Sequence, residues 1–393
     1  MARRLSLPFR DVQLKVVGPK GAFIASRVQK LDVQTNFPST DIDELGNNEH
    51  AGVVTDSPEL TLTFQAMDTS VNIFAFLTGS FPYPSTGVSI TQLKDIDVVG
   101  QVRDADVSDM VKSFHGKKLR INGFNFSYSA TGEATEEYTA IGSEKRWFRN
   151  DVIVDKSTTP GTSITLTQTP IVLKNGNKVL SVIVDGVYFT EVAAGPSTNE
   201  YSVSGTTVTL GTALATQAIV VYHASPAGNN YDYLRDTSIP AAVRGKNIPV
   251  MIGVNNISRV QSVTMRGEFP NSPVKEMGNV SIVGYSTQVP KVTGDISILD
   301  TDLDMVSLFS TGVLSSQTGE TEFADSAFTA SGLALTIKIL SPVDNTTVLK
   351  TLYVPQIVIT SEGHSTSVGG DATQTFGWKS GTGNLFIYSG AKI

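Results

Sequence analysis

Cysteine is absent from this chain of 393 residues, which excludes disulfide bonds and thiolate chemistry. Charged residues are few, at 17%, and the formal net charge of −7 provides no basic excess for gripping nucleic-acid phosphates. No stretch approaches 18 consecutive apolar residues, so no membrane helix is expected. The start has two adjacent arginines, Arg3 and Arg4, but no apolar core follows them as in a signal peptide. These absences predict a soluble protein made in a cytosol without export.

Catalytic and metal-binding motifs are also missing. The histidines are isolated, and none lies in an HxH or HExxH spacing. The sequence has no GxSxG nucleophile elbow, no GxxxxGK phosphate loop and no GxGxxG after a strand. We therefore expect no catalytic residue, no metal and no cofactor, and a protein that is not an enzyme. The four histidines are His50, His115, His223 and His364.

Ser, Thr, Gly and Val are plentiful, and many short runs alternate between apolar and polar residues. In residues 59–67, ELTLTFQAM, the side chains of Leu60, Leu62 and Phe64 fall on one face and the threonines on the other. Such runs separated by polar turns are typical of a mainly β protein. The length is sufficient for two or three domains with real cores.

The chain contains an internal repeat at an offset of 232 residues. Residues 26–38, SRVQKLDVQTNFP, are matched by residues 258–270, SRVQSVTMRGEFP, so that Phe37 falls on Phe269. Without any gap, 15 of the 44 positions from residue 26 to residue 69 are identical at this offset. Because repeats determine the architecture, the sequence predicts a duplicated domain.

Each copy predicts the same succession of a strand, a long polar loop, a second strand and a short helix. The loop spans about residues 36–58 in the first copy and 268–290 in the second, and its constant length marks it as a feature of the fold. The apolar period then changes to three or four residues, which predicts a helix of roughly three turns, closed by Gly79 or Gly312. Its structural residues are Asp68, Val71, Phe74 and Leu77 in the first copy, and Asp300, Leu303, Val306 and Phe309 in the second.

The ends of the two copies also correspond. Residues 119–140 match residues 352–378 when Ala134-Thr135 is aligned with Ala372-Thr373, and both segments predict a long strand, a Gly-rich turn and another strand. Between the copies, short alternating runs and an Asn175-Gly176 hairpin signal predict a separate small β-sandwich without a helix. The predicted domains are a first β domain over residues 1–150, an inserted β-sandwich with a linker over 151–242, and a second β domain over 243–393.

The long loop of the first copy is rich in side-chain oxygens, which are the ligands that calcium prefers. The second copy has Pro273 and Lys275 where the first has Asp41 and Asp43, so the oxygen cluster is not repeated. We therefore favour a solvated loop that contacts another subunit over a calcium site. The candidate contact residues are Asp41, Asp43, Glu44, Asn47 and Asn48, with Lys275, Glu276 and Asn279 in the second copy.

These features resemble the tail tube proteins of tailed bacteriophages. The resemblance is carried by Glu59–Met67 followed by Asp68–Gly79, by Lys291–Leu299 followed by Asp300–Gly312, and by the two end hairpins. It implies a mainly β fold of two tandem tail-tube-like β-sandwich or barrel domains, each with one short α-helix. The inserted β-sandwich is similar to the immunoglobulin-like domains that decorate phage tails.

The resemblance implies a structural virion protein that forms stacked, pseudo-sixfold, trimeric rings, a tail tube through which DNA is ejected. Each β unit would supply about four strands to an inner barrel, about 24 in all. The implied partners are further copies of the chain, the tape measure, terminator and distal tail proteins, and double-stranded DNA in transit, without sequence-specific binding and without a membrane. The wall of the channel should carry more Asp, Glu, Ser and Thr than Lys and Arg, because phosphate contacts would retain the DNA. Synthesis in the host cytoplasm and a final location in the virion follow.

Two other interpretations stay open. Another tail ring or baseplate component would form one ring and would not polymerise. A β-rich glycan-binding surface protein would expose aromatic side chains near a groove. Trp147 and Trp378 are single and lie near strand ends, which fits either such a groove or packing in a core.

Overall fold

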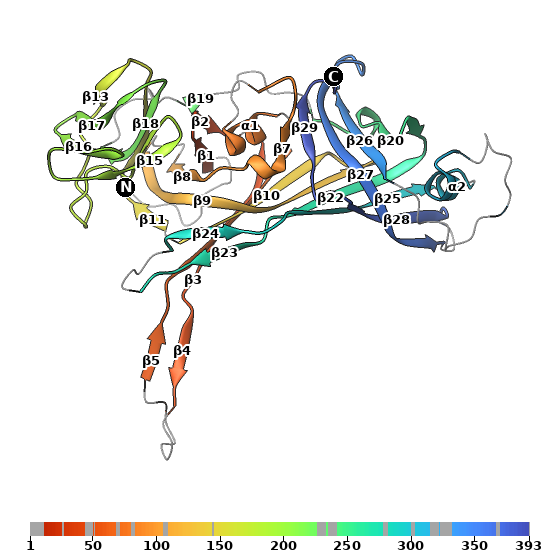
Figure 1. The fold of residues 1–393 in the computed structure, drawn as a ribbon, viewed down its shortest axis with the longest axis horizontal. Helices are drawn as coiled ribbons and strands as arrows, with labels where there is room; N and C mark the ends of the chain where they lie inside the picture. Colours follow the sequence, from red (N-terminus) through yellow and green to blue (C-terminus); the bar gives the residue numbers. More distant parts are fainter. Residues whose placement is uncertain are drawn as a thin grey trace.

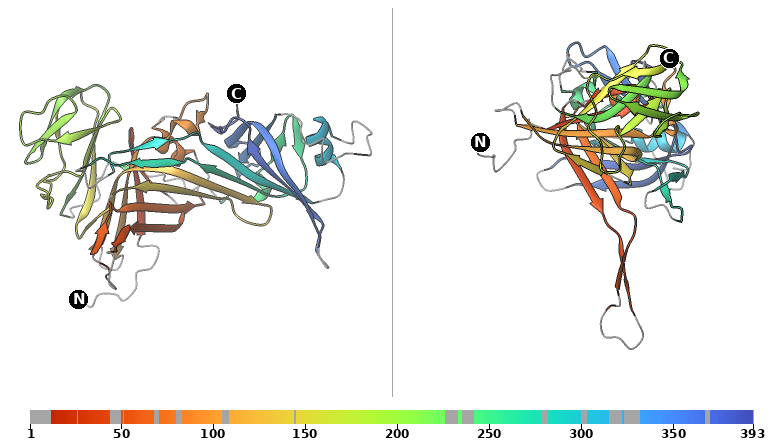
Figure 2. Two further views of the ribbon diagram at one scale, coloured as in Figure 1. Left: turned by 60° about the horizontal axis from the view of Figure 1, so that its bottom comes forward. Right: turned by 90° about the vertical axis from the view of Figure 1, so that its left-hand side faces the viewer.

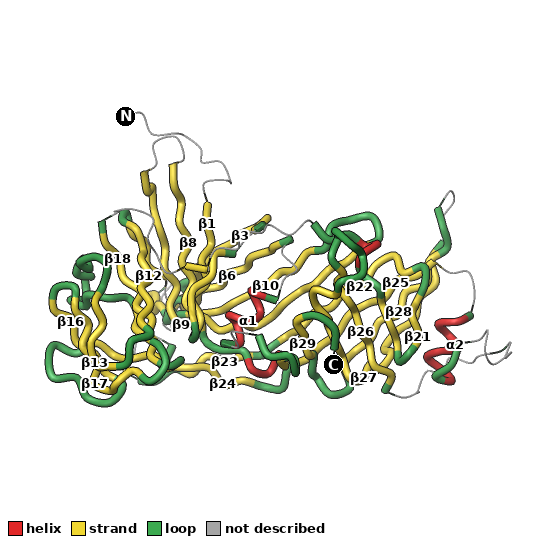
Figure 3. The backbone as a smooth tube through the Cα atoms, turned by 90° about the horizontal axis from the view of Figure 1, so that it is seen from above, coloured by secondary structure: helices red, strands yellow, loops and turns green. Residues whose placement is uncertain are grey.

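A computed structural model shows a mainly β fold, as the composition and patterning predict. It is elongated, with residues 151–224 at one end and the second repeat at the other (Figure 1). Figure 3 shows the same order from above, with the two short helices set against strands. The described residues are 12–25, 27–43, 50, 52–67, 71–79, 83–104, 109–143, 145–225, 233–234, 242–277, 282–299, 303–314, 322, 332–366 and 370–392.

The first repeat consists of two sheets that share one long strand, β9 (Asp109–Ser129). The beginning of β9 pairs with β8 (Ile96–Asp104) and β11 (Lys145–Phe148), and its end pairs with β10 (Thr135–Gly142). The remaining elements are β1 (Val12–Gly18), β2 (Gly21–Ile24), β3 (Val28–Asn36), β4 (Ser39–Ile42), β5 (Gly52–Thr55), β6 (Glu59–Ala66), α1 (Asn72–Thr78), β7 (Val88–Ser89) and the 3-10 turn η2 (Ile90–Gln92).

The second repeat has the same plan around its own long strand, β27 (Val348–Ser365). The beginning of β27 pairs with β26 (Leu333–Leu340) and β29 (Phe386–Ser389), and its end pairs with β28 (Thr373–Ser380). The remaining elements are η3 (Gly245–Asn247), β20 (Val250–Ile252), β21 (Asn255–Ile257), β22 (Val260–Glu268), β23 (Asn271–Val274), β24 (Gly284–Thr287), β25 (Lys291–Leu299) and α2 (Asp304–Thr311).

The repeated SRVQ sequence forms the same bulged corner in both copies. Arg27 and Arg259 have positive φ angles of 53° and 62°, a left-handed conformation that is uncommon outside glycine. The pairing of β3 with β6 skips Gln29, and the pairing of β22 with β25 skips Gln261. A bulge bends a strand and adjusts its twist, so this short motif sets the direction of the first sheet strand in each copy.

Four strands from each repeat join into one continuous antiparallel sheet. The order is β3-β6-β10-β9 in the first repeat, followed by β22-β25-β28-β27 in the second. The junction between the repeats is the pairing of β9 with β22, from Gly123 opposite Glu268 to Ser129 opposite Ser262. Each repeat therefore contributes four strands to this sheet, as the resemblance implied.

The two repeats also share a hydrophobic core. One cluster of buried side chains extends from Leu14 to Ile387, and β7 of the first repeat pairs with β29 of the second. Within this core the ammonium of Lys350 lies 2.5 Å from the carboxylate of Glu136, and both side chains are fully buried. The hydroxyls of Tyr128 and Tyr138 donate to the same carboxylate at 3.1 and 2.9 Å. A buried pair with satisfied hydrogen bonds thus links the repeats.

At one pair of equivalent core positions on facing strands, the large and the small residue are swapped between the two repeats. Leu62 and Ala140 face each other on β6 and β10, whereas Gly294 and Trp378 face each other on β25 and β28. A Cβ on Gly294 would lie 2.6 Å from the indole of Trp378, closer than real contacts allow. Close-packed interiors tolerate such exchanges when the total volume is kept, so Trp378 is a core residue.

Residues 151–224 form the inserted β region. Its strands are β12 (Asp151–Ser157), β13 (Gly161–Thr165), β14 (Ser181–Val184), β15 (Val187–Glu191), β16 (Glu200–Ser204), β17 (Thr207–Leu214) and β18 (Ala218–Ala224). They pair in the order β12-β18-β14-β15-β16-β17-β13. Asn175-Gly176 forms a turn closed by the Gly176 N–H and the Leu173 carbonyl at 2.9 Å, but no strands flank it, so the predicted hairpin is wrong. After this region, β19 (Tyr233–Leu234) pairs with β2.

Two further predictions need correction. The helices are shorter than three turns, with seven residues in α1 and eight in α2. Leu303 precedes α2 and is exposed, because the helix begins one residue later and buries Met305, Leu308 and Phe309. The two long loops are not structureless, since each contains a hairpin, β4–β5 or β23–β24.

Candidate assembly interface

The continuous sheet ends in two unpaired edges. β3 is bonded to β6 on one side, and the end of β27 is bonded to β28 on one side, but neither has a described strand on its other side. Unpaired strand edges present free N–H and C=O groups that pair readily with another chain. By the repeat, β3 corresponds to β22 and β27 corresponds to β9. β22 and β9 are the two strands that pair with each other within the chain.

The correspondence extends to individual residues. The pairing of β10 with β9 begins at Thr135 and Ser127, and the pairing of β28 with β27 begins at Thr373 and Ser365. Both pairings then slip by one residue at the same place, after Thr139 and after Gly377. The end of β27 therefore presents an edge with the backbone geometry of the β9 edge that accepts β22.

Phe37 and Phe269 occupy equivalent positions but have opposite surroundings. Phe269 is 4% exposed, its ring lies 5.8 Å from that of Phe124, and its N–H donates to the Asn122 carbonyl at 2.8 Å. Phe37 is 67% exposed, although the flanking sequence is repeated. Exposing a large aromatic ring to water forfeits the free energy of burial. Phe37 thus marks a surface suited to burial against a partner.

β9 and the end of β27, which occupy equivalent positions in the two repeats, carry side chains of different polarity. On β9, the rings of Phe124 and Phe126 lie on the core side, 4.6 Å apart, at the junction with β22. On β27, the aligned residues are Glu362 and His364, and both are exposed. The edge that closes within the chain is therefore apolar, and the edge that remains open is polar.

The second hairpin, β23–β24, is docked on the first repeat. The side-chain amide of Asn271 donates to the Ile121 carbonyl at 3.3 Å, and Arg120 donates to the Thr287 hydroxyl at 3.2 Å. The ammonium of Lys275 lies 2.7 Å from the carboxylate of Asp56, and this hydrogen bond lowers the pKa of Asp56.

The described strands of the first hairpin, β4–β5, project away from the body (Figures 1 and 2). All four residues of β4 are exposed, and so are Val53 and Val54 of β5. The two equivalent hairpins thus differ in that β23–β24 contacts the first repeat through a few side chains, whereas β4–β5 extends into solvent. A projecting hairpin with exposed apolar side chains is suited to binding a neighbouring subunit.

The predicted contact residues divide between these two hairpins. Asp41 is exposed on β4, and Asp43 contacts His50 through a 2.5 Å hydrogen bond near the hairpin tip. Lys275 and Glu276 are exposed after β23. The helix residues Phe74, Leu77 and Phe309 are buried, and Val71 and Val306 are half-buried. Glu44, Asn47, Asn48, Asn279, Asp68 and Asp300 lie outside the described residues.

The face of the continuous sheet opposite the core is polar and balanced in charge. It follows from the register that alternate residues of all eight strands lie on this face. Serine and threonine dominate it, for example Thr61, Thr139 and Ser127. The charged side chains on it are acidic at Asp32, Glu59, Glu137, Glu268 and Asp295 and basic at Lys30, Arg120, Arg266, Lys291 and Lys379.

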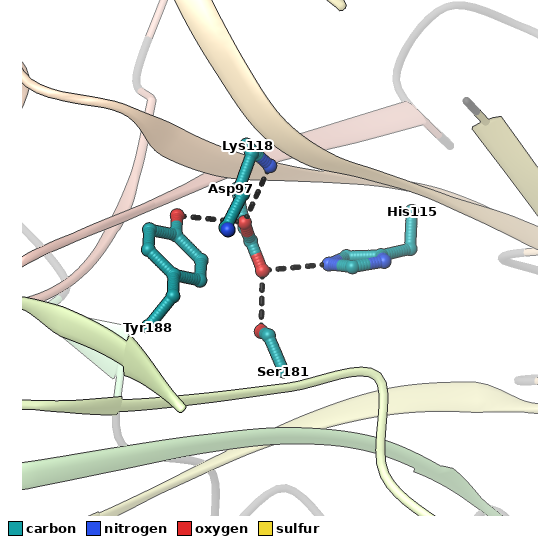
Figure 4. A network of polar contacts seen from close by, with 5 residues as sticks. All are labelled: Asp97, His115, Lys118, Ser181 and Tyr188. Carbon is teal, nitrogen blue, oxygen red and sulfur yellow. Dashed lines mark hydrogen bonds and ion pairs between the residues drawn. The ribbon is translucent and has the colours of Figure 1, made fainter. Parts of the chain in front are cut away.

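A buried polar network attaches the inserted region to the first repeat (Figure 4). The carboxylate of Asp97 on β8 contacts His115 Nε2 at 2.9 Å and accepts from the Lys118 N–H at 3.0 Å. From the inserted region, the Ser181 hydroxyl donates to the same carboxylate, and the Tyr188 hydroxyl does so at 2.8 Å. The inserted region is thereby held by a fully buried charge.

The network stabilises the charged form of a buried carboxylate. Burial alone would raise the pKa of Asp97, but the adjacent His115 and the hydrogen bonds outweigh burial and lower this pKa to about 2. The Ser181 hydroxyl donates to the Asp97 carboxylate and so contributes to this lowering. No sequence pattern indicates this network, because Asp97 and Ser181 are 84 residues apart.

No helix in the described part of the chain is both long and apolar enough to cross a membrane. Within those same residues, no group of three or more His, Asp or Glu side chains is arranged to hold a metal ion.

The chain was compared with protein families, with curated sequences and with solved structures. No protein-family model matches the chain, and no curated sequence matches it. Among solved structures, it is similar to the tube-terminating cap of the anti-feeding prophage, studied by cryo-electron microscopy. The two are 12% identical with a TM-score of 0.29, over 39% of this chain and 96% of the cap. A likeness at this TM-score carries no argument about fold or function.

Proposed function

We propose that this chain is a structural protein of a phage-type tail tube, assembled from trimeric rings. The observation that carries the proposal is the match between the junction inside the chain and the two edges left open. The edge of β27 in one copy would accept β3 of the next copy, as β9 accepts β22 within the chain. Such a heterologous, head-to-tail contact closes into a ring when its rotation permits.

The proposal specifies a register. Within the chain, Gly267 lies opposite Phe124. If β3 pairs with β27 of the next copy in the same register, Thr35 lies opposite Glu362 and Val33 lies opposite His364 of that copy. Phe37 then lies just past these paired residues. This position is equivalent to that of Phe269, which is buried in the internal junction. Each of these contacts joins different chains and is absent from the monomer.

Three chains with eight strands each would give a barrel of about 24 strands. With strands about 4.8 Å apart and tilted by about 40°, the backbone diameter is roughly 50 Å. Side chains reduce this to about 40 Å, which suits passage of duplex DNA. The face described above would line the channel. Its balanced charge supports transit, because a basic wall would hold the phosphates.

Electron microscopy of the purified full chain, supported by mass measurement in solution, tests the proposal. We expect hollow rods or rings with threefold symmetry at high protein concentration. Phe37→Asp should leave a folded monomer that forms neither, because the aspartate would place a charge in the new junction. Val187→Asp, on the exposed surface of the inserted region, serves as the matched control and should assemble like the wild type.

A chain that stays monomeric at high concentration would contradict the proposal, and so would rings that survive Phe37→Asp. Single rings that never stack would instead favour the alternative of a terminator or baseplate ring. That outcome keeps the strand pairing between copies but removes the stacking of rings into a tube.

A further inference from the structure

A groove lies where the inserted region meets β11, away from the open sheet edges. Its volume is about 500 Å³, and it runs between the end of β11 and the turn that contains Asn175. Two smaller hollows adjoin it and share lining residues with it, among them Trp147 and Arg146. The groove therefore uses residues from two parts of the chain that are far apart in sequence.

The groove is cationic in a chain whose net charge is −7. The main hollow and its two neighbours are lined by Arg146, Arg149, Lys174, Lys112 and Lys117. None of the described residues that line these three hollows is Asp or Glu. Clustered cations in a concave site raise the local concentration of anions.

Trp147 stands at the edge of this groove and is 52% exposed. The ammonium groups of Lys112 and Lys145 lie 5.1 and 5.2 Å from its ring centroid, and the ring of Phe114 meets it at 5.4 Å. These contacts fix the aromatic ring beside the cations. An exposed aromatic side chain next to a groove is the feature expected of a glycan-binding protein, and Trp147 has it whereas Trp378 is buried in the core.

His223 provides an independent sign of a ligand. It lines the groove, it is only 8% exposed, and both of its ring nitrogens are buried without a hydrogen-bond partner. Buried polar atoms in native proteins are nearly always paired. Burial lowers the pKa of His223 and outweighs an opposing contribution from the Ile171 backbone, so the neutral ring offers one donor and one acceptor, which a hydroxyl group satisfies. Its ring also packs at 4.7 Å against Phe148, another lining residue.

We propose that this groove binds an anionic saccharide, a short sugar chain that bears carboxylate or phosphate groups. Arg149 and Lys174 would meet the charged groups, Trp147 would contact the apolar side of a sugar ring, and His223 would bond a hydroxyl. The side-chain amides of Asn150 and Asn175, which also line the groove, suit further hydroxyls. The proposal does not depend on ring assembly, since all of these residues belong to β11, the turn that follows it and the inserted region.

Tryptophan fluorescence and calorimetry of the full chain test this inference. The probes are trigalacturonate for carboxylates, glucose 1-phosphate for phosphates, and maltotriose as the neutral control. We expect at least one anionic probe to bind about tenfold or more tightly than maltotriose and to lose affinity as salt rises. The fluorescence change should disappear in Trp147→Phe, because the other tryptophan, Trp378, is buried.

Variants separate a site from a merely basic surface. Arg149→Gln combined with Lys174→Gln should weaken the anionic probe about tenfold or more, whereas Lys379→Gln, an exposed cation on β28, should leave affinity unchanged. His223→Phe should weaken binding while raising the melting temperature, because it removes two unpaired buried nitrogens. A purely structural histidine would lose stability on this change.

Several outcomes would overturn the proposal. Equal affinity for maltotriose, no binding of either anionic probe at millimolar concentration, or unchanged affinity in the Arg149→Gln/Lys174→Gln variant would each do so. Binding of a poly-glutamate peptide in place of the saccharides would identify a protein-docking surface instead. Because none of these variants alters β3 or β27, loss of sugar binding with rings intact separates this inference from the assembly proposal.

Discussion

The junction inside the chain and the edges left open use the same backbone geometry with different side chains. Inside the chain, Phe269 and Phe124 are buried against each other. At the open edges, the equivalent residues are the exposed Phe37 and the charged Glu362. A surface that must remain soluble before assembly cannot be as apolar as one that closes during folding. The difference teaches that the two repeats kept the same backbone edges while their side chains diverged, as expected if the open edges pair only in the proposed ring.

The largest expected effect on stability comes from comparing the two equivalent phenylalanines. Phe269→Ala should lower the free energy of unfolding by about 3–5 kcal/mol, because it leaves a cavity in the internal junction. Phe37→Ala should change the free energy of unfolding of the monomer by less than about 0.5 kcal/mol, since its ring is exposed. Urea denaturation of both variants gives the measurement. Similar losses would show that the two sites do not differ as the structure has them.

The buried pair Glu136–Lys350 offers a second way to break the internal junction. Glu136→Gln should destabilise the monomer by about 3 kcal/mol or more, because it leaves the Lys350 ammonium buried without its counter-charge. Gln374 is the residue that the second repeat places at this position. Adding Lys350→Met should recover part of the loss, and a double-mutant cycle measures the coupling. Strictly additive losses would contradict a direct interaction.

The Asp97 network should have a smaller, pH-dependent effect. The pKa of the Asp97 carboxyl, about 2, lies below the ordinary value of 3.8, so the folded state favours the charged form. The stabilisation is complete above about pH 4 and is lost as the pH falls towards 2, which corresponds to about 2 kcal/mol. Asp97→Asn should therefore unfold more easily at pH 7, and its difference from the wild type should shrink below pH 4. A difference that is constant with pH would disprove this assignment.

The smallest effect is expected at the docked hairpin. Lys275→Gln removes an ion pair with Asp56 that is exposed to solvent, and such pairs contribute little in water. We expect the melting temperature to stay within the scatter of repeated measurements at physiological salt. Hydrogen exchange of β23 and β24 should nevertheless increase in the variant. A large fall in melting temperature would mean that this hairpin is essential to the fold.

Local sequence signals predicted the strands well where one face is buried. Leu60, Leu62 and Phe64 alternate with threonines, and this strand forms as expected. The same signals missed β4, because all four of its residues are exposed and no alternation distinguishes it from a loop. They also missed the Asp97 network and the groove at Trp147, whose members come together only through folding.

The sequence by itself determined that two equivalent β units exist, because the repeated residues and their spacing are recorded in the order of the chain. It also determined the bulged corners, since SRVQ specifies them locally at Arg27 and Arg259. Only the tertiary structure decided which edges pair within the chain and which stay open. Equivalent backbones make equally good partners, and the choice between them depends on which edges the connected chain can bring together and on the core packing that follows.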